Sequence, residues 1–545
     1  MASLLINRIA FTRNVDEALA SSPLKENLKE IQIAVSTKRT IAIKALRCKI
    51  SKLRQQQLFT LVTLFKEQLD VIVDLLGSTK PAQVWSNECR FYSAPNGTVF
   101  CKCGENTITV GDHNPARNML VVTSLSRVVR RAYFQACSAK GYLWLHGPPG
   151  TGKTETANDT AAMLGREFRR FDCSATWNVP KLMKYLNDGS KGAVLVFDSF
   201  SAVAPDIQRA CIDAVAKAGN FAVFTGKSPP STALAQSYNF SVKKMTVPCY
   251  DKIVQVMLST EGFVDCDTLG TAIHECLQTC RKNCTKQSWY DFGLRAYKSC
   301  VAQAGAHGRT TGFANELKIV CNTVGSKLFS TATETDRPVV LAAVRKSFGQ
   351  DAVIPKAWTN TSLERALPQI VQDVAETRHG VCVIGLPSDK VTACISAIQI
   401  TADVKTIVVD NFSKQFNKTD HPLVSAMRQA SQTTERVYVC LRLVGDCSPD
   451  VLSPLHSLLD DNRKIFLENN EVVALPRNMR IIVFAKNCDD WSPATVSRLS
   501  TVCGVLSPPV DWKAKYEEAQ AKCVKLQEQL DTLHANLATL ITSTE

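Results

Sequence analysis

One octapeptide, GPPGTGKT at residues 147–154, constrains the fold of this chain more than any other segment. It fits the pattern G-x-x-x-x-G-K-[ST], in which glycines allow backbone N–H groups to point at phosphates. In that pattern Lys153 contacts the β- and γ-phosphates, and the Thr154 hydroxyl binds Mg²⁺. We therefore predict ATP with Mg²⁺ as the ligand, held by the whole loop: Gly147, Pro148, Pro149, Gly150, Thr151, Gly152, Lys153 and Thr154.

The residues around this loop alternate between strand and helix patterns. We predict strands at 142–145, 167–172, 193–198 and 221–225, a helix at 154–164, and a helical lid over 262–330. Such alternation indicates a parallel sheet with helices on both faces. The apolar run GAVLVFD ends at Asp198, and a P-loop enzyme holds its Mg²⁺ with an Asp in this position. Asp198 is therefore our second predicted Mg²⁺ ligand, beside Thr154.

A weaker copy of the same pattern follows in the second half. Strands are expected at 381–384, 406–410, 437–443 and 481–485, with a hairpin at 464–478. The corresponding loop, GLPSDK at 385–390, is shorter and lacks the second glycine, and Val444 falls where the first copy has Asp198, with Asp446 nearby. We expect two tandem α/β modules, of which only the first binds nucleotide.

The two ends of the chain have other patterns. Residues 24–77 repeat apolar side chains every three or four positions, which predicts helix, and 84–112 reads as short strands around the turn Pro95-Asn96-Gly97. Residues 512–541 carry apolar side chains in a 4-3-4-3 rhythm. That rhythm predicts either an intermolecular coiled coil or an amphipathic helix packed on its own domain.

Composition narrows the choice of partners and compartment. The net charge of +14 favours polyanionic partners, but the excess is spread along the chain without the aromatic interleaving of a nucleic-acid site. No stretch reaches 18 apolar residues, so we expect no membrane span. The 21 cysteines are irregularly spaced, as in cytosolic proteins with reduced thiols. Cys101 and Cys103 lack a second ligand pair at zinc spacing.

Longer segments resemble the motor region of dynein heavy chains. GPPGTGKTET at 147–156, MTVPCYDKIVQVMLSTEGF at 245–263 and WYDFGLRAYKS at 289–299 resemble its first AAA+ module, and LVVTSLSRVVRRAY at 120–133 resembles the chain just before it. LLDDNRKIFLENNEVVALP at 458–476 and SPATVSR at 492–498 resemble the second module. The resemblance predicts a segment like the end of the linker at 1–115, AAA+ modules at 116–335 and 336–510 (the second degenerate), and a heptad-patterned helix at 511–545.

The resemblance also implies a function. Dynein heavy chains carry a ring of six AAA+ modules, and ATP hydrolysis in the first drives movement along microtubules. Arg295, in GLRA, would be the lid arginine facing the γ-phosphate, and Arg498, in ATVSR, the arginine finger given by the second module to the first. The implied partners are dynein complex subunits or other heavy-chain fragments, with indirect microtubule association and self-association through 512–541. The implied location is the cytoplasm and cytoskeleton, including the axoneme of a cilium or flagellum.

Three departures from the family pattern weaken the case for catalysis. Ser199, in FDSFSA, replaces the catalytic Glu of FDEFNR; Ser228, in GKSPP, stands at the usual sensor Asn; and Ser241 stands at the Arg of an FRP string. The chain also ends after two modules, which suggests a fragment of a split heavy chain or a shortened dynein-like protein. Two functions stay open at this point: a motor segment that hydrolyses ATP slowly, and a non-catalytic ATP-binding assembly module.

Overall fold

A computed structural model describes most of the chain between residues 2 and 504. The described ranges are 2–48, 50–113, 119–148, 151–173, 192–349, 380–402, 404–409, 419–443, 455–459, 463–467, 471–489, 493–496 and 498–504, with single residues or pairs around 182–186, 367–375 and at 491. The chain divides into two compact units, the first formed by Met1–Cys284, Asp291–Lys327 and Leu341–Ile354, and the second by Thr285–Tyr290, Leu328–Val340 and Pro355–Glu545. The predicted helix at 512–541 and the positions Val444 and Asp446 lie outside the described residues.

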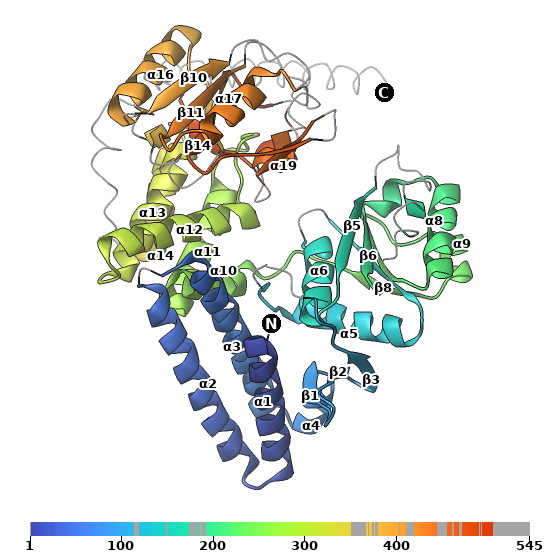
Figure 1. The fold of residues 1–545 in the computed structure, drawn as a ribbon. Helices are drawn as coiled ribbons and strands as arrows, with labels where there is room; N and C mark the ends of the chain where they lie inside the picture. The colour runs from blue at the N-terminus through green and yellow to red at the C-terminus, as the bar shows by residue number, and fades with distance from the viewer. Residues whose placement is uncertain are drawn as a thin grey trace, which may run out of the picture. The chain divides into compact units, whose positions relative to one another are not determined.

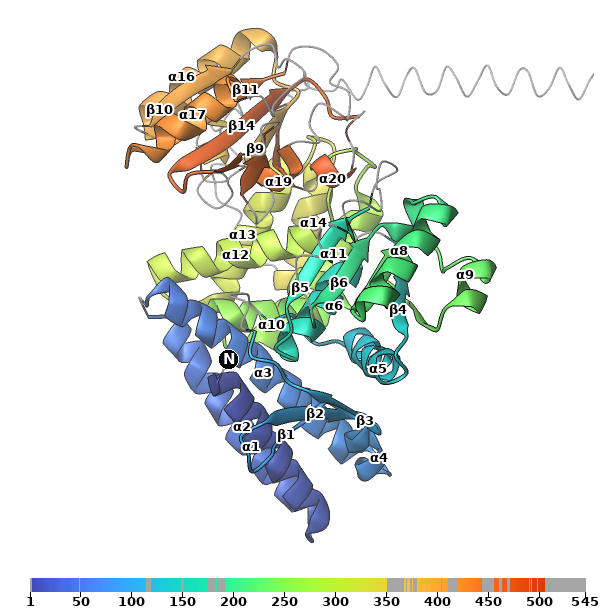
Figure 2. The same ribbon diagram turned by 45° about the vertical axis from the view of Figure 1, so that its right-hand side comes forward.

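The first unit begins with helices and a small antiparallel sheet. The helices are α1 (Ala2–Ala20), α2 (Leu24–Leu46), α3 (Lys52–Gly77) and α4 (Pro81–Ser86), and the strands are β1 (Arg90–Ser93), β2 (Val99–Cys103) and β3 (Asn106–Thr109). Figure 2 shows α2 beside α3 and the small sheet beside α1, and these elements are in contact. The helices predicted within 24–77 and the strands around Gly97, which has φ +82° in the turn, are confirmed.

A five-stranded parallel sheet follows, in the order β5-β6-β7-β4-β8. Its strands are β4 (Tyr142–His146), β5 (Phe168–Asp172), β6 (Val194–Asp198), β7 (Phe221–Gly226) and β8 (Phe240–Lys244). One face packs on α5 (Ser124–Ser138) and α6 (Lys153–Met163), and the other on η1 (Phe200–Ala202) and α8 (Pro205–Ala218). Figure 1 shows α6 and α8 on opposite sides of the strands.

The region after this sheet is helical, as predicted. After the short helix α9 (Thr232–Ser237) come α10 (Tyr250–Glu261), α11 (Cys266–Asn283), α12 (Leu294–Thr311), α13 (Glu316–Thr331) and α14 (Arg337–Phe348). Within the described residues, no helix combines the length and the apolar character needed to cross a bilayer.

The second unit contains a second parallel sheet, in the order β10-β11-β14-β9-β15. The strands are β9 (Gly380–Ile384), β10 (Lys405–Val409), β11 (Val437–Arg442), β14 (Met479–Ala485) and β15 (Ser500–Cys503). Helix α16 (Ser388–Ala402) covers one face and α17 (Pro422–Ser431) the other. The predicted hairpin pairs β12 (Lys464–Phe466) with β13 (Val472–Ala474), and the short helix α19 (His456–Leu459) contacts β12. Another short helix, α20 (Pro493–Val496), follows β14.

The two parallel sheets have the same strand order, because β5, β6, β7, β4 and β8 of the first sheet correspond in turn to β10, β11, β14, β9 and β15 of the second. In each sheet the strand that comes first in the chain is inserted between later ones: β4 lies between β7 and β8, and β9 lies between β14 and β15. Strand β7 therefore separates β4 from β6, which ends at Asp198, and β14 separates β9 from β11. The predicted fold class, parallel sheets flanked by helices, is confirmed. The two edge strands β8 and β15 were not among the predicted strands.

Candidate nucleotide-binding site

The phosphate loop leaves β4 through a glycine that no other residue can replace without moving the backbone. Gly147 has φ +145°, and a Cβ on it would lie 2.1 Å from the Met245 carbonyl oxygen. Its N–H donates to the Gly226 carbonyl at 3.1 Å. At the other end Gly152 has φ +80° and caps α6 in the left-handed region that glycine adopts most easily. Pro149 and Gly150 lie outside the described residues.

Lys153 is the first residue of α6, and its side chain reaches back into the loop. Its Nζ donates to the carbonyl oxygens of Gly147 at 2.9 Å and Pro148 at 2.7 Å. Burial lowers the pKa of Lys153, while the Asp198 carboxylate acts in the opposite direction. The ammonium group therefore lies inside the loop, at the amino end of α6, where free backbone N–H groups and the helix dipole favour an anion.

Asp198 ends β6 with both carboxylate oxygens engaged. Its Oδ1 accepts a hydrogen bond from Thr225 Oγ1 at 2.7 Å, and its Oδ2 forms an ion pair with Arg170 at 2.8 Å. Thr225 Oγ1 also accepts from the Ser199 backbone N–H at 3.3 Å. Thr225 and Arg170 were not predicted as site residues. The parallel register between β6 and β7 would have revealed Thr225, because it places the penultimate residue of β7 beside Asp198.

The donor set here fits Mg²⁺. The Thr154 hydroxyl and the Asp198 carboxylate are hard oxygen ligands of the kind this ion prefers, and a protein commonly supplies only one or two of them beside substrate phosphates. When bound, the ion would neutralise charge on the phosphate oxygens. Arg170 would compete with a metal ion for this carboxylate, because its guanidinium already forms an ion pair with Oδ2 of Asp198.

The position next to Asp198 carries no acid. Ser199 is exposed and has φ +59°, a left-handed conformation that is uncommon for a residue other than glycine. Ser228 is exposed as well, and its carbonyl accepts a hydrogen bond from Trp144 Nε1 at 3.1 Å. Ser241 lies on the edge strand β8, paired with Leu143. The residue after Asp198 therefore offers a hydroxyl group where a general base would require a carboxylate.

The two predicted arginines lie away from the loop in sequence and in different units. Arg295 is the second residue of α12 and is exposed, in the first unit. Arg498 follows α20 in the second unit, where its N–H closes a turn on the Thr495 carbonyl at 3.1 Å. Their roles toward the nucleotide stay predictions.

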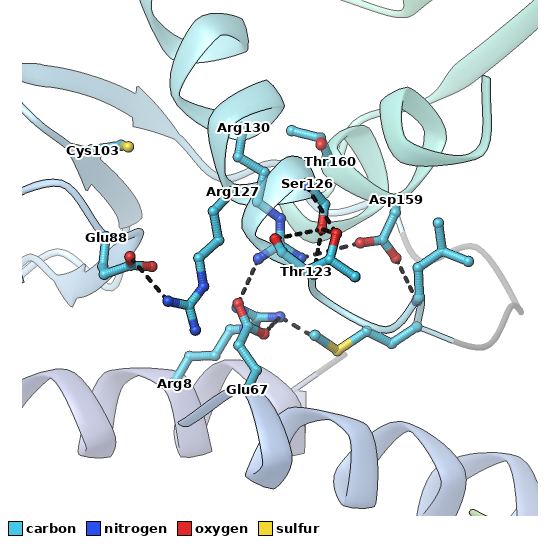
Figure 3. Close-up of polar contacts among 12 residues, drawn as sticks. Arg8, Glu67, Glu88, Cys103, Thr123, Ser126, Arg127, Arg130, Asp159 and Thr160 are labelled. Atoms are coloured by element: carbon cyan, nitrogen blue, oxygen red, sulfur yellow. Dashed lines mark hydrogen bonds and ion pairs between the residues drawn. The ribbon is translucent and has the colours of Figure 1, made fainter. Parts of the chain in front are cut away.

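A buried charge cluster anchors the helix that begins at the phosphate loop (Figure 3). Asp159 of α6 accepts from the Leu120 N–H at 2.9 Å and from Arg130 at 3.1 Å. Arg130, which is 3% exposed, also pairs with Glu67 of α3, and Glu67 lies 3.6 Å from Arg8 of α1. Burial opposes ionisation of Glu67, but Arg130 and Arg8 outweigh it and lower its pKa. The cluster thus joins the phosphate-loop helix to the amino-terminal helices.

The second sheet preserves the start of this architecture and then departs from it. Gly385 donates its N–H to the Ala485 carbonyl at 3.0 Å, in the same way that Gly147 donates to Gly226. The loop then ends quickly, because only residues 385–387 separate β9 from α16, whereas 147–152 separate β4 from α6. Three residues cannot form the six-residue loop that surrounds Lys153.

The strand register also corrects one prediction about the second sheet. Phe484 of β14 pairs with Val383 of β9, which corresponds to the pairing of Thr225 with Leu145 in the first sheet. The β11 residue opposite Phe484 is Arg442, so Arg442 rather than Val444 occupies the position of Asp198. Its NH1 donates to Thr392 Oγ1 of α16 at 3.2 Å. A guanidinium thus stands where the first sheet has the Asp198 carboxylate.

Comparison with known proteins gives one family and many related chains. Residues 112–218 and 238–388 match the model of the hydrolytic ATP-binding site of the dynein motor region. The chain is similar to mouse dynein axonemal heavy chain 5, with 24% identity over 93% of this chain and 12% of the relative. Similarity extends to the flagellar outer-arm dynein gamma chain of Chlamydomonas reinhardtii (24%, 96% of this chain, 13% of the relative) and to cytoplasmic dynein 2 heavy chain 1 of Caenorhabditis elegans (24%, 83% and 12%).

These comparisons confirm the resemblance drawn from the sequence motifs. The similarity is distant but covers most of the chain, including both parallel sheets. The chain spans about an eighth of the length of these relatives, 12% or 13% in each case.

Proposed function

Because this chain is related to the dynein heavy-chain motor region over most of its length, we propose that its first α/β module binds ATP with Mg²⁺ and hydrolyses it slowly. The observation that carries the proposal is the position of Lys153, held by the loop carbonyls of Gly147 and Pro148 at the amino end of α6. Asp198 supplies the metal-binding carboxylate, positioned by Thr225. Arg295 and Arg498 would complete the site as the lid arginine and the arginine finger.

Slow turnover follows from the chemistry beside Asp198. A positioned general base accelerates attack by water about 10²–10⁴-fold. Ser199 is neutral at physiological pH and cannot take that proton efficiently. Binding, in contrast, depends on the loop, on Lys153 and on the metal-binding residues, all of which are present. The proposal therefore separates affinity, which we expect to be ordinary, from turnover, which we expect to be low.

Steady-state turnover of the purified chain tests this proposal. We expect slow hydrolysis by the wild type and none by Lys153→Ala. In Ser199→Glu we expect the turnover rate to rise by about 10²-fold or more. Ser199→Ala is the matched control, and its rate should equal that of the wild type. Absence of saturable affinity for ATP or ADP in the presence of Mg²⁺ would overturn the proposal.

A second function is favoured by the Asp198–Arg170 ion pair and by Arg442. Both place guanidinium groups against positions that a catalytic P-loop protein keeps for Mg²⁺. In this alternative ATP is a structural ligand of a non-catalytic assembly module. It predicts normal nucleotide affinity with no turnover in either the wild type or Ser199→Glu, whereas the catalytic proposal requires turnover in both.

Assembly is the remaining part of the proposal. We infer from the relatives that the chain associates with dynein complex subunits or heavy-chain fragments in the cytoskeleton, and through them with microtubules. Self-association through 512–541 is a separate expectation from its heptad rhythm. Mass in solution, measured with and without residues 512–545, tests the latter, and an unchanged monomer would exclude a coiled coil.

A further inference from the structure

Three cysteines gather on one face of the small antiparallel sheet. Cys89 immediately precedes β1, and Cys101 and Cys103 lie two residues apart on β2, so their side chains share one face. All three are free thiols, with Cys89 partly exposed and the other two buried. In the described part of the chain no group of metal-binding side chains has the geometry of a metal site, so these thiols are not explained as zinc ligands.

The strand register sets Cys89 and Cys103 opposite one another. Arg90 pairs with Lys102, and continuing this antiparallel register by one pair matches Cys89 with Cys103. The Ala94 N–H bonds to the Thr98 carbonyl, which makes 94/98 a hydrogen-bonded pair and, by alternation, 89/103 a non-hydrogen-bonded pair. Cα atoms in such a pair are about 4.5 Å apart, within the range that a disulfide bridges.

The surroundings activate the partly exposed thiol. The neighbouring thiols of Cys101 and Cys103 lower the pKa of Cys89 well below its ordinary value, and the nearby Arg130 guanidinium acts in the same direction against burial. The neighbouring Cys89 thiol, together with burial, raises the pKa of Cys103, whose Sγ lies 3.4 Å from the Asn87 carbonyl oxygen. One thiol is thus prepared to ionise while its neighbour remains protonated. Figure 3 shows Cys103 on the side of the charge cluster where Glu88 pairs with Arg127.

We propose that Cys89 is a redox-reactive thiol which a hydroperoxide oxidises, and that Cys103 then closes a Cys89–Cys103 disulfide. In the first step the Cys89 thiolate attacks one oxygen of hydrogen peroxide, the O–O bond breaks, and the leaving hydroxide becomes water. In the second step the Cys103 sulfur attacks the Cys89 sulfenic acid, the S–O bond breaks, and hydroxide leaves with the Cys103 proton as a second water. Two thiols lose two electrons and one peroxide is reduced to two waters.

The chain offers an internal control for reactivity. Cys249 is exposed, but its thiol donates to Asp251 Oδ1 at 2.7 Å. That hydrogen bond to a carboxylate raises the pKa of Cys249. If exposure alone governed oxidation, the exposed Cys48 and Cys249 would react before Cys89, whereas activation by its neighbours selects Cys89.

Peptide mapping of the full chain tests the proposal. Trypsin cleaves after Arg90 and after Lys102, so Cys89, Cys101 and Cys103 fall on three different peptides. After a brief treatment with hydrogen peroxide and alkylation of the remaining thiols, we expect the Cys89 peptide linked to the Cys103 peptide, with Cys249 still alkylated. Oxidation of Cys249 before Cys89, or a link from Cys89 to Cys101 in place of Cys103, would overturn the assignment.

Variants and a measurement on the unmodified protein complete the test. In Cys103→Ser we expect a Cys89 sulfenic acid that a cyclic 1,3-diketone traps, and in Cys89→Ser we expect Cys103 to remain a thiol. In the wild type at pH 6, where an ordinary thiol is less than about 1% ionised, iodoacetamide should alkylate Cys89 at least about tenfold faster than Cys249. Equal alkylation rates at pH 6 would refute the activation of Cys89 without relying on any variant.

Discussion

At the carboxyl edge of the first sheet, six residues connect β4 to α6, whereas three connect β9 to α16 at the same edge of the second sheet. Both loops start with a glycine bonded to the neighbouring strand, so the two sheets share a frame. They differ in the residues at this edge. The first sheet has Lys153 and Asp198, whereas the second has a shorter loop and, at the end of β11, Arg442. The two sheets therefore share a strand order while they differ in the length of one loop and in the charge at the end of one strand.

Charge shows the difference most directly. In the first sheet the Asp198 carboxylate ends β6, and the Lys153 ammonium group is held by the loop that follows β4. In the second, the Arg442 guanidinium occupies the position that corresponds to Asp198. Both helices that follow the loops carry an acid in their first turn, Glu155 in α6 and Asp389 in α16. The exchange of a carboxylate for a guanidinium opposes a bound Mg²⁺–nucleotide, and together with the three-residue loop it explains why we expect one nucleotide site in the described pair of sheets.

The largest expected effect compares lysines at the start of the two helices. Lys153→Ala removes charge-assisted hydrogen bonds to phosphate worth about 1.5–3 kcal/mol each, so nucleotide affinity should fall by about 10²-fold or more. Lys390→Ala, in α16, should leave the affinity unchanged. Titration of both variants with ATP in Mg²⁺ measures the difference. A comparable loss in Lys390→Ala would show that the second sheet binds nucleotide after all.

The next effect compares a buried ion pair with an exposed one. Arg130 is 3% exposed and pairs with Glu67 and Asp159, and removal of one partner of a buried pair costs about 3–5 kcal/mol. Arg130→Met should lower the free energy of unfolding of the first unit by about that amount. Arg428 and Glu471 form a pair in the second unit that is 44% and 42% exposed, and such pairs contribute about 0–1 kcal/mol.

Urea unfolding of Arg130→Met and Arg428→Met measures both costs on similar substitutions. The expected outcome is a clear shift of one transition in the first variant and little shift in the second. Equal, small shifts would mean that the Arg130 cluster does not anchor α6, and the proposed support of the phosphate-loop helix would then be wrong.

Acid should distinguish the two units through the same cluster. Arg130 and Arg8 hold the pKa of Glu67 below its unfolded value despite burial. The stabilisation of the first unit by ionised Glu67 is therefore fully present above the unfolded carboxyl pKa of about 4.3. It is lost as the pH falls through the folded pKa. The free energy of unfolding of the first unit should decline on acidification below that pH, and Glu67→Gln should reduce this dependence. Glu471→Gln, in the exposed pair, is the control and should leave the decline unchanged.

The sequence predicts eight of the ten strands of the two parallel sheets, including the edge strands β5 and β10. The buried strands β4, β6 and β9 were predicted to within one residue at either end, because both of their faces are covered and their apolar runs are continuous. The edge strands β8 and β15 were missed. In β8 the sequence FSVKK is partly exposed and charged, so neither its periodicity nor its composition distinguishes it from a loop.

A similar limit applies to the site. The phosphate loop and Asp198 were predicted because the chemistry lies in consecutive residues with a fixed spacing. Thr225, Arg170 and Arg442 acquire their roles from the register between strands far apart in the chain. Arg442 was missed in favour of Val444 because a shift of two residues keeps a side chain on the same face of a strand. Contacts across strands therefore supply what motif spacing cannot.

The smallest expected effect concerns Arg170, which holds Oδ2 of Asp198 in the first sheet. The guanidinium is 46% exposed, and exposed ion pairs contribute about 0.2–1 kcal/mol. Mg²⁺ must displace it, so Arg170→Ala should lower the Mg²⁺ concentration that gives half-maximal ATP binding by about two- to fivefold. The adjacent Arg169→Ala removes the same charge but leaves Asp198 untouched, because Arg169 pairs with Glu167.

A Mg²⁺ titration at fixed ATP compares the two arginine variants directly. A shift in Arg170→Ala alone would show that the ion pair with Asp198 restrains metal binding, making the first sheet a weakened version of a catalytic site. Equal shifts in both variants would mean that loss of one nearby positive charge, and not loss of the ion pair with Asp198, changes the Mg²⁺ requirement. A higher Mg²⁺ requirement in Arg170→Ala would instead show that Arg170 contacts the nucleotide. The charge difference between the two sheets at this edge would then not be explained by competition between arginine and the metal.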